Sequence, residues 1–82
     1  MADFVVEILS PEKSVFLGRA ESVTAKAIDG EFQILRGHAP YMNILAPGEI
    51  RLNTEENTCL HFKHNGGIIE VTNDKVLALV SS

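Results

Sequence analysis

Apolar residues occupy alternate positions in several short segments of this 82-residue chain. Phe4, Val6 and Ile8 form one such series, and Ile50 and Leu52 form another. Successive side chains of a β-strand point to opposite faces, so this period of two predicts strands with one buried face. Glycine and proline interrupt the segments at short, fairly even intervals, which is typical of turns between short strands. The pattern predicts an all-β sandwich or barrel.

Three connections can be predicted from their residues. Residues 53–57 are expected to join the strand near Ile50 to the strand near Phe62 as a hairpin. Asn65-Gly66-Gly67 is expected to turn that strand into a strand over 68–72, and Asn73-Asp74 to turn it again, because glycine and asparagine favour tight turns.

Residues 20–28 fit two readings, a short helix or a strand with Val23, Ala25 and Ala27 inward. The strand suits the neighbouring segments better. We find no long amphipathic helix, internal repeat or linker, and 82 residues correspond to one domain over residues 1–82. A chain of this size buries only about 60% of the surface that it exposes when unfolded. Little room is therefore left for a catalytic cleft.

Charge and cysteine content limit the partners and the compartment. Seven basic and eleven acidic residues give a net charge of −4, and without a basic cluster the chain is not expected to bind nucleic acid. Cys59 is the single cysteine, so an internal disulfide is impossible. The N-terminus does not resemble a signal peptide, and the longest apolar run, residues 76–80, is too short to cross a membrane. We expect a reducing, cytosol-facing setting.

Cys59, His61 and His64 are the residues that most resemble a metal or catalytic site. On a strand, Cys59 and His61 share one face and His64 points to the other, so the three cannot converge on zinc. Cys59 with a histidine could act as nucleophile and base, but no motif places an orienting Asn or Asp. No glycine-rich loop precedes a helix with the Lys and Ser or Thr of a phosphate site. We predict no catalytic residue, no metal site and no cofactor.

Two loops in the middle of the chain have either an ordinary or a functional interpretation. Asp29-Gly30-Glu31-Phe32 carries two carboxylates, and Gly37-His38-Ala39-Pro40-Tyr41 follows one short strand later. Both can be simple turns, with His38 hydrogen-bonded locally. Both can also be recognition surfaces, because binding residues are often placed on the loops of a rigid scaffold. Composition does not decide between these possibilities.

Several motifs together resemble the N-terminal domain of the epsilon subunit of F-type ATP synthases. The stretch 29–40, Asp-Gly-Glu-Phe-Gln-Ile-Leu-Arg-Gly-His-Ala-Pro, is the most specific part of the resemblance. Pro47-Gly48 and the strand Gly66-Gly67-Ile68-Ile69-Glu70-Val71 also match, as do residues 6–11 and the Phe16-X-Gly18 pair. Gln33 and Arg36 depart from the usual family pattern. The C-terminal helical hairpin of the family, which is associated with inhibition of ATP hydrolysis and in some members with ATP binding, is absent from this sequence.

The resemblance implies a flattened β-sandwich of about ten short, mostly antiparallel strands. It implies a non-catalytic rotor subunit at the foot of the central stalk, with the gamma subunit, the ring of c subunits and the catalytic head complex as partners. The domain would transmit torque, so that ion flow is coupled to ATP synthesis. It would lie at the cytoplasmic face of the bacterial plasma membrane, or of the equivalent organelle membrane, without direct insertion into lipid.

The resemblance also assigns two sets of contact residues. The set expected to face the c ring is Ile28, Asp29, Gly30, Glu31, Phe32 and Gln33. The set expected to face gamma is Ser10, His38, Ala39, Pro40, Tyr41 and Asn43. Two alternatives remain beside this assignment. One is a small metal- or thiol-dependent enzyme that uses Cys59 with His61 or His38, and the other is a free-standing β-sandwich interaction module.

Overall fold

The computed structural model describes residues 3–81 and contains nine strands in this range. They are β1 (Phe4–Leu9), β2 (Ser14–Ala20), β3 (Ser22–Ala27), β4 (Gly30–Leu35), β5 (Tyr41–Leu45), β6 (Gly48–Asn53), β7 (Cys59–His64), β8 (Gly67–Val71) and β9 (Lys75–Val80). The predicted all-β sandwich is confirmed, with nine strands where about ten were expected. Residues 3–81 form no helix, and hence no helix that is long and apolar enough to span a membrane.

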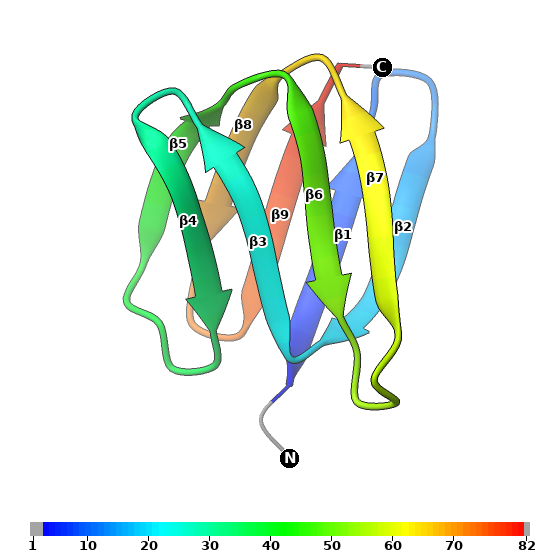
Figure 1. The fold of residues 1–82 in the computed structure, drawn as a ribbon, viewed down its shortest axis with the longest axis vertical. Helices are drawn as coiled ribbons and strands as arrows, with labels where there is room; N and C mark the ends of the chain where they lie inside the picture. Colours follow the sequence, from blue (N-terminus) through cyan, green and yellow to red (C-terminus); the bar gives the residue numbers. More distant parts are fainter. Residues whose placement is uncertain (1–2, 82) are drawn as a thin grey trace.

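The strands form one sheet that folds over into two layers (Figure 1). The rear layer has the order β2-β1-β9-β8-β5, and the front layer contains β4, β3, β6 and β7. A single antiparallel bridge between Ala27 and Leu45 connects the layers through β3 and β5. All pairs are antiparallel except β1 with β9. The first and last strands therefore lie side by side in the rear layer.

Alternation in the sequence determines which side chains fill the space between the layers. In β1, the inward residues Phe4, Val6 and Ile8 are buried, while the residues between them remain partly exposed. The strand interpretation of residues 20–28 is confirmed by β3, whose Val23, Ala25 and Ala27 are at most 2% exposed. Burial of such apolar surface contributes about 25 cal/mol per Å². The inward half of each strand thus supplies the main stabilisation.

Aromatic pairs close both lateral edges of the sandwich. Phe16 of β2 and Phe62 of β7 lie with ring centroids 5.3 Å apart at one edge. Phe32 of β4 and Tyr41 of β5 lie 5.3 Å apart at the other. Both pairs are tilted and pack against the core, the arrangement that aromatic rings prefer over face-to-face stacking. The two layers are therefore joined by side chains where no backbone ladder connects them.

Two of the three predicted connections are confirmed and one is wrong. β6 and β7 form the predicted hairpin, and β8 turns into β9 at Asn73-Asp74. Gly66-Gly67 is not a hairpin turn, because β7 pairs with β6 whereas β8 pairs with β5 and β9. The chain crosses here from the front layer to the rear layer (Figure 1). A glycine pair indicates a sharp change of direction, but the strand that is paired afterwards depends on distant residues.

Gly67 is required by the close approach of the neighbouring strand, which gives a first prediction. A Cβ atom at this position would overlap the carbonyl oxygen of Leu79 and lie 2.8 Å from the Cα of Val80. We expect Gly67→Ala to lower the free energy of unfolding by about 1–3 kcal/mol, because backbone must move to make room. Urea denaturation followed by circular dichroism measures this loss.

Gly48→Ala is the matched control. A Cβ atom there would meet nothing closer than the carbonyl oxygen of Ala46 at 4.0 Å. We expect the free energy of unfolding of this variant to lie within about 0.5 kcal/mol of that of the wild type. Equal stability of the two variants would contradict the steric role of Gly67.

Candidate docking surfaces

The turn between β3 and β4 carries the first predicted contact set. Ile28 is 66% exposed, and its backbone N–H donates to the carbonyl oxygen of Ile44 at 3.0 Å. The carboxylate of Asp29 accepts a hydrogen bond from Nδ2 of Asn43 at 3.0 Å. Gly30 has a φ of 131°, which favours glycine over residues with a Cβ atom. The turn is thus held against β5 and presents Ile28 and Asp29 at one end of the sandwich.

The rest of this set alternates along β4. Glu31 and Gln33 are exposed, whereas Phe32 is half-buried beside Tyr41. Glu31 forms an ion pair with Arg51 at 2.8 Å. Exposed ion pairs typically contribute only about 0–1 kcal/mol. A partner with its own basic group could therefore bind the Glu31 carboxylate with little loss of free energy from the broken pair. The Phe32 side chain instead packs within the sandwich.

The structure divides the second predicted set among three places. His38, Ala39 and Pro40 are exposed in the connection from β4 to β5, at the end of the sandwich opposite to the β3–β4 turn (Figure 1). The Nδ1 atom of His38 lies 2.7 Å from the carbonyl oxygen of Ala39, so this histidine has a local partner. Ser10 lies at the other end, where its hydroxyl donates to the carbonyl oxygen of Lys13 at 3.2 Å.

Tyr41 and Asn43 occupy the edge of the sandwich between the layers. The Nδ2 atom of Asn43 donates to the Tyr41 hydroxyl at 2.6 Å as well as to Asp29. The Tyr41 ring packs against the core and lies 5.9 Å from the ring of His38. These two side chains connect the β3–β4 turn, β5 and the loop of His38. In the structure they position both predicted contact surfaces.

Sequence reasoning missed an exposed apolar surface on the rear layer. The outward side of the rear layer carries apolar side chains on five neighbouring strands, which we call the outer apolar face. Its residues are Leu9, Leu17, Met42, Ile44, Ile68, Leu77 and Leu79.

The strand register brings four of these side chains together, whereas Leu17, Leu77 and Met42 lie opposite Glu7 or Glu70 on the same outward side. Ile44 lies opposite Ile68, Ile68 opposite Leu79, and Leu79 opposite Leu9. Ile44, Ile68 and Leu79 are each about half exposed, and Met42 is 66% exposed. The signal was present in the run of apolar residues over 76–80. Strands that are apolar at successive positions are typically covered on both faces.

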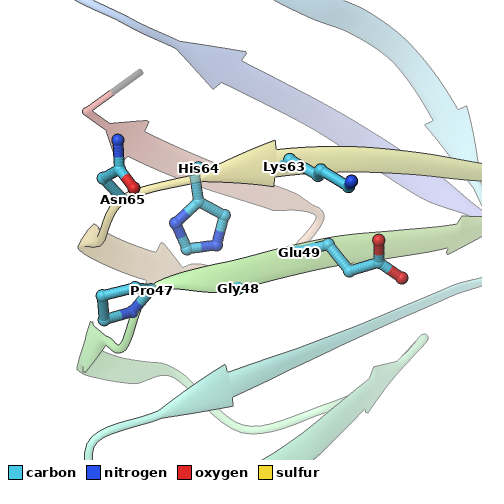
Figure 2. A pocket seen from close by; sticks show the side chains of 6 residues that line it. All are labelled: Pro47, Gly48, Glu49, Lys63, His64 and Asn65. Atoms are coloured by element: carbon cyan, nitrogen blue, oxygen red, sulfur yellow. The ribbon is translucent and has the colours of Figure 1, made fainter.

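A surface hollow lies where β7 crosses toward β8 (Figure 2). It is lined by Pro47, Gly48, Glu49, Lys63, His64 and Asn65. The ring of His64 lies above the strand that carries Gly48, while the Glu49 and Lys63 side chains extend away from it. His64 points inward and Cys59 and His61 point outward, as the alternation predicted. Among residues 3–81 no three potential metal ligands gather.

His64 stabilises the crossing in its neutral form. The backbone N–H of Gly66 donates to its Nδ1 atom at 2.9 Å, and its Nε2 atom is buried without a hydrogen-bond partner. The residue is 6% exposed, and burial lowers the pKa of the imidazole below its ordinary value of 6.5. A proton on Nδ1 would displace the Gly66 N–H and place a charge on a buried ring.

A second prediction follows from this burial. Because the pKa of His64 is lower in the folded state, the unfolded state binds more protons below pH 6.5. The contribution of His64 to stability is complete above that pH and is lost as the pH falls toward the folded-state pKa. We expect His64→Leu to lose less stability on acidification than the wild type, measured as the urea midpoint from about pH 7.5 to about pH 5.

His38→Gln is the control for this measurement, since His38 is exposed and its ring nitrogen lies beside the carbonyl oxygen of Ala39, not beside a carboxylate. It should follow the pH dependence of the wild type. If His64→Leu and the wild type lose stability in parallel, His64 is not the group responsible.

Comparison with known proteins supports the fold and the family. Residues 3–82 match the family described as ATP synthase, Delta/Epsilon chain, beta-sandwich domain. The ATP synthase epsilon chain of Chlorobium limicola is 38% identical over 76 residues, which cover 93% of this chain and 86% of the relative. The epsilon chain of Micrococcus luteus is 35% identical over 82 residues, or 100% of this chain and 90% of the relative.

Solved structures agree in fold. A chain of the Tetrahymena thermophila mitochondrial ATP synthase, in a structure of the central stalk and c ring, superposes with a TM-score of 0.75 at 26% identity. That match covers 95% of this chain and 63% of the other. A chain of the Euglena gracilis mitochondrial enzyme reaches 0.93 at 19% identity, covering 100% of this chain and 52% of the other. This chain belongs to the ATP synthase delta/epsilon chain family, whose β-sandwich domain it carries.

Proposed function

We propose that this chain is a non-catalytic rotor component of the central stalk of an F-type ATP synthase. It links the gamma subunit to the ring of c subunits below the catalytic head and so couples ion translocation to ATP synthesis. Family membership supports the complex, and the outer apolar face is the observation that carries the linking role. The complex is membrane-associated, and the domain is peripheral at the cytoplasmic face of the bacterial membrane or its organelle equivalent.

The outer apolar face is the proposed surface for gamma. Contiguous exposed apolar side chains of this kind mark protein interfaces, because covering them removes apolar area from water. Ser10 directly follows Leu9 at one end of the face, and His38, Ala39 and Pro40 lead into β5 at the other. The predicted gamma-facing residues therefore border the face at both ends, while Tyr41 and Asn43 support it from within the sandwich.

The β3–β4 turn is the proposed surface for the c ring. Ile28 and Asp29 protrude there, and Asn43 restricts the orientation of the Asp29 carboxylate. Glu31 adds a second carboxylate one strand position beyond Gly30. Carboxylates form charge-assisted hydrogen bonds with basic groups, and we propose that polar loops of the c subunits supply such groups. The turn and the apolar face thus serve two different partners.

The third prediction tests the outer apolar face with Ile68→Glu. A carboxylate in the middle of a covered apolar surface would have to be desolvated on binding. We expect at least about a tenfold loss of affinity for gamma, equivalent to about 1.4 kcal/mol. Isothermal titration calorimetry with purified gamma subunit measures the change.

Leu35→Glu is the matched control for Ile68→Glu. Leu35 is 53% exposed, close to the 48% of Ile68, but it lies on β4 in the front layer. The affinity of the Leu35→Glu variant for gamma should stay within about twofold of the wild type. Equal losses in both variants, with both folded by circular dichroism, would refute this assignment of the face.

The fourth prediction concerns Glu31. Glu31→Gln keeps the shape of the side chain and removes its charge, and we expect weaker docking to the c ring, with roughly tenfold lower affinity. The readout is retention of this subunit on reconstituted complexes, together with ATP-driven ion pumping in vesicles.

Arg51→Gln separates docking from the internal ion pair. Arg51 binds Glu31 in the structure, so its removal breaks the same pair while leaving the carboxylate in place. We expect this variant to retain docking. If it reproduces the defect of Glu31→Gln, the pair itself and not a contact with the ring is what matters.

A further inference from the structure

Glu70 places a carboxylate within the outer apolar face. It lies on β8 opposite Met42 of β5 on one side and Leu77 of β9 on the other, and Ile68 precedes it on the same side of the strand. Glu70 is exposed. A negative charge therefore lies among apolar neighbours on the surface that we propose for gamma.

The basic residues of the rear layer are already bound to other carboxylates. The five strands of this layer contain two of them, Arg19 and Lys75. Nζ of Lys75 donates to Oε1 of Glu7 at 3.0 Å, and Arg19 donates to Asp3 at 2.9 Å. Within residues 3–81, Glu70 forms no ion pair. Its charge is thus the one on this face that the chain itself does not compensate.

A partner that covers the face would remove water from this carboxylate. Desolvation of a charged group is costly unless an opposite charge and hydrogen bonds replace the water. The side chains of Met42 and Leu77 carry no hydrogen-bond donor, so the neighbouring strands cannot supply the replacement. The compensating group must come from the partner.

We propose that Glu70 forms an ion pair with one lysine or arginine of the gamma subunit when gamma covers the outer apolar face. This inference rests on the proposed assignment of that face to gamma. The pair makes Glu70 a specificity-determining residue, because a partner with an apolar surface alone would leave the carboxylate desolvated and unpaired. The apolar side chains supply contact area, and Glu70 selects a partner with a basic residue at the matching position.

The strand register defines where that basic residue lies relative to the apolar contacts. Ile44, Ile68 and Leu79 form a row across neighbouring strands. Glu70 is two residues beyond Ile68 along β8, a distance of about 7 Å. The charged end of the gamma side chain is therefore expected about 7 Å to one side of the apolar group that covers the row. Its aliphatic stem can pack on Met42 and Leu77.

The fifth prediction is tested by titration calorimetry of the purified chain with purified gamma subunit. Glu70→Gln nearly keeps the size of the side chain and removes its charge. We expect a loss of affinity of about tenfold or more, because the basic residue of gamma is left without its partner.

Glu70→Leu tests the pair by the sign of its effect. If the Glu70 carboxylate had no cationic partner, a leucine would add apolar contact and gamma would bind more tightly. With the ion pair, we expect this variant also to bind at least about tenfold more weakly, because a cation would be covered by apolar groups.

Glu56→Gln is the matched control, because it removes the same charge from an exposed residue in the hairpin loop of the front layer. The affinity of the Glu56→Gln variant should stay within about twofold of the wild type. The inference is overturned if both Glu70 variants bind as tightly as the wild type or more tightly. An equal loss in Glu56→Gln also overturns it, since net charge alone would then explain the effect.

Comparison with Ile68→Glu separates the ion pair from the assignment of the face. If Ile68→Glu weakens binding and Glu70→Gln does not, the ion pair is refuted while the face remains assigned to gamma. If neither variant weakens binding, both the pair and the assignment fail. Urea midpoints of all variants establish that they are folded.

Discussion

Packing of the inward side chains between the two layers holds the sandwich together and positions its loops and outward faces. Within residues 3–81 β3 and β5 connect the layers through one backbone bridge, between Ala27 and Leu45, with its hydrogen bonds at Ile28 and Ala46, so most of their association rests on side chains. The buried half of each strand fills the interior, and the pairs Phe16–Phe62 and Phe32–Tyr41 close the lateral edges. A small domain buries a limited share of its surface. Its inward side chains are therefore needed for the core and do not line an internal binding site.

The two outward sides of the sandwich differ in the character of their exposed side chains, and the proposed contacts with partners follow this difference. The rear layer presents apolar side chains in register across β5, β8, β9 and β1, beside the acidic Glu7 and Glu70, and such a surface is suited to a protein partner. The front layer presents charged and polar groups, including the Glu31–Arg51 pair and the group of Cys59, His61 and Glu49. The β3–β4 turn lies at one end, where Asn43 ties it to the edge pair. One rigid scaffold thereby carries three separate surfaces.

The buried positions of a strand could be predicted from a few consecutive residues. The contacts among the candidate site residues could not, because they depend on which strands become neighbours. Val23, Ala25 and Ala27 were correctly predicted to be buried, since alternation is a property of a few consecutive residues. The Gly66-Gly67 crossing was misread as a hairpin, because pairing of β8 with β5 and β9 involves residues distant in sequence. The hydrogen bond between Glu49 and His61 was not predicted for the same reason, since the β6–β7 register brings them together.

Alternation along the sequence was enough to predict the all-β class and the inward residues of most strands. The motifs at residues 29–40 and Gly66-Gly67 were enough to show the resemblance to the ATP synthase epsilon family. These features reside in short-range periodicity and in motifs of fixed spacing. The hydrogen bond between Tyr41 and Asn43 at the edge of the sandwich, and the grouping of Ile44, Ile68 and Leu79 on one face, became visible only in the folded chain. Exposure and adjacency are set by layer packing and strand register, because these join residues far apart along the sequence.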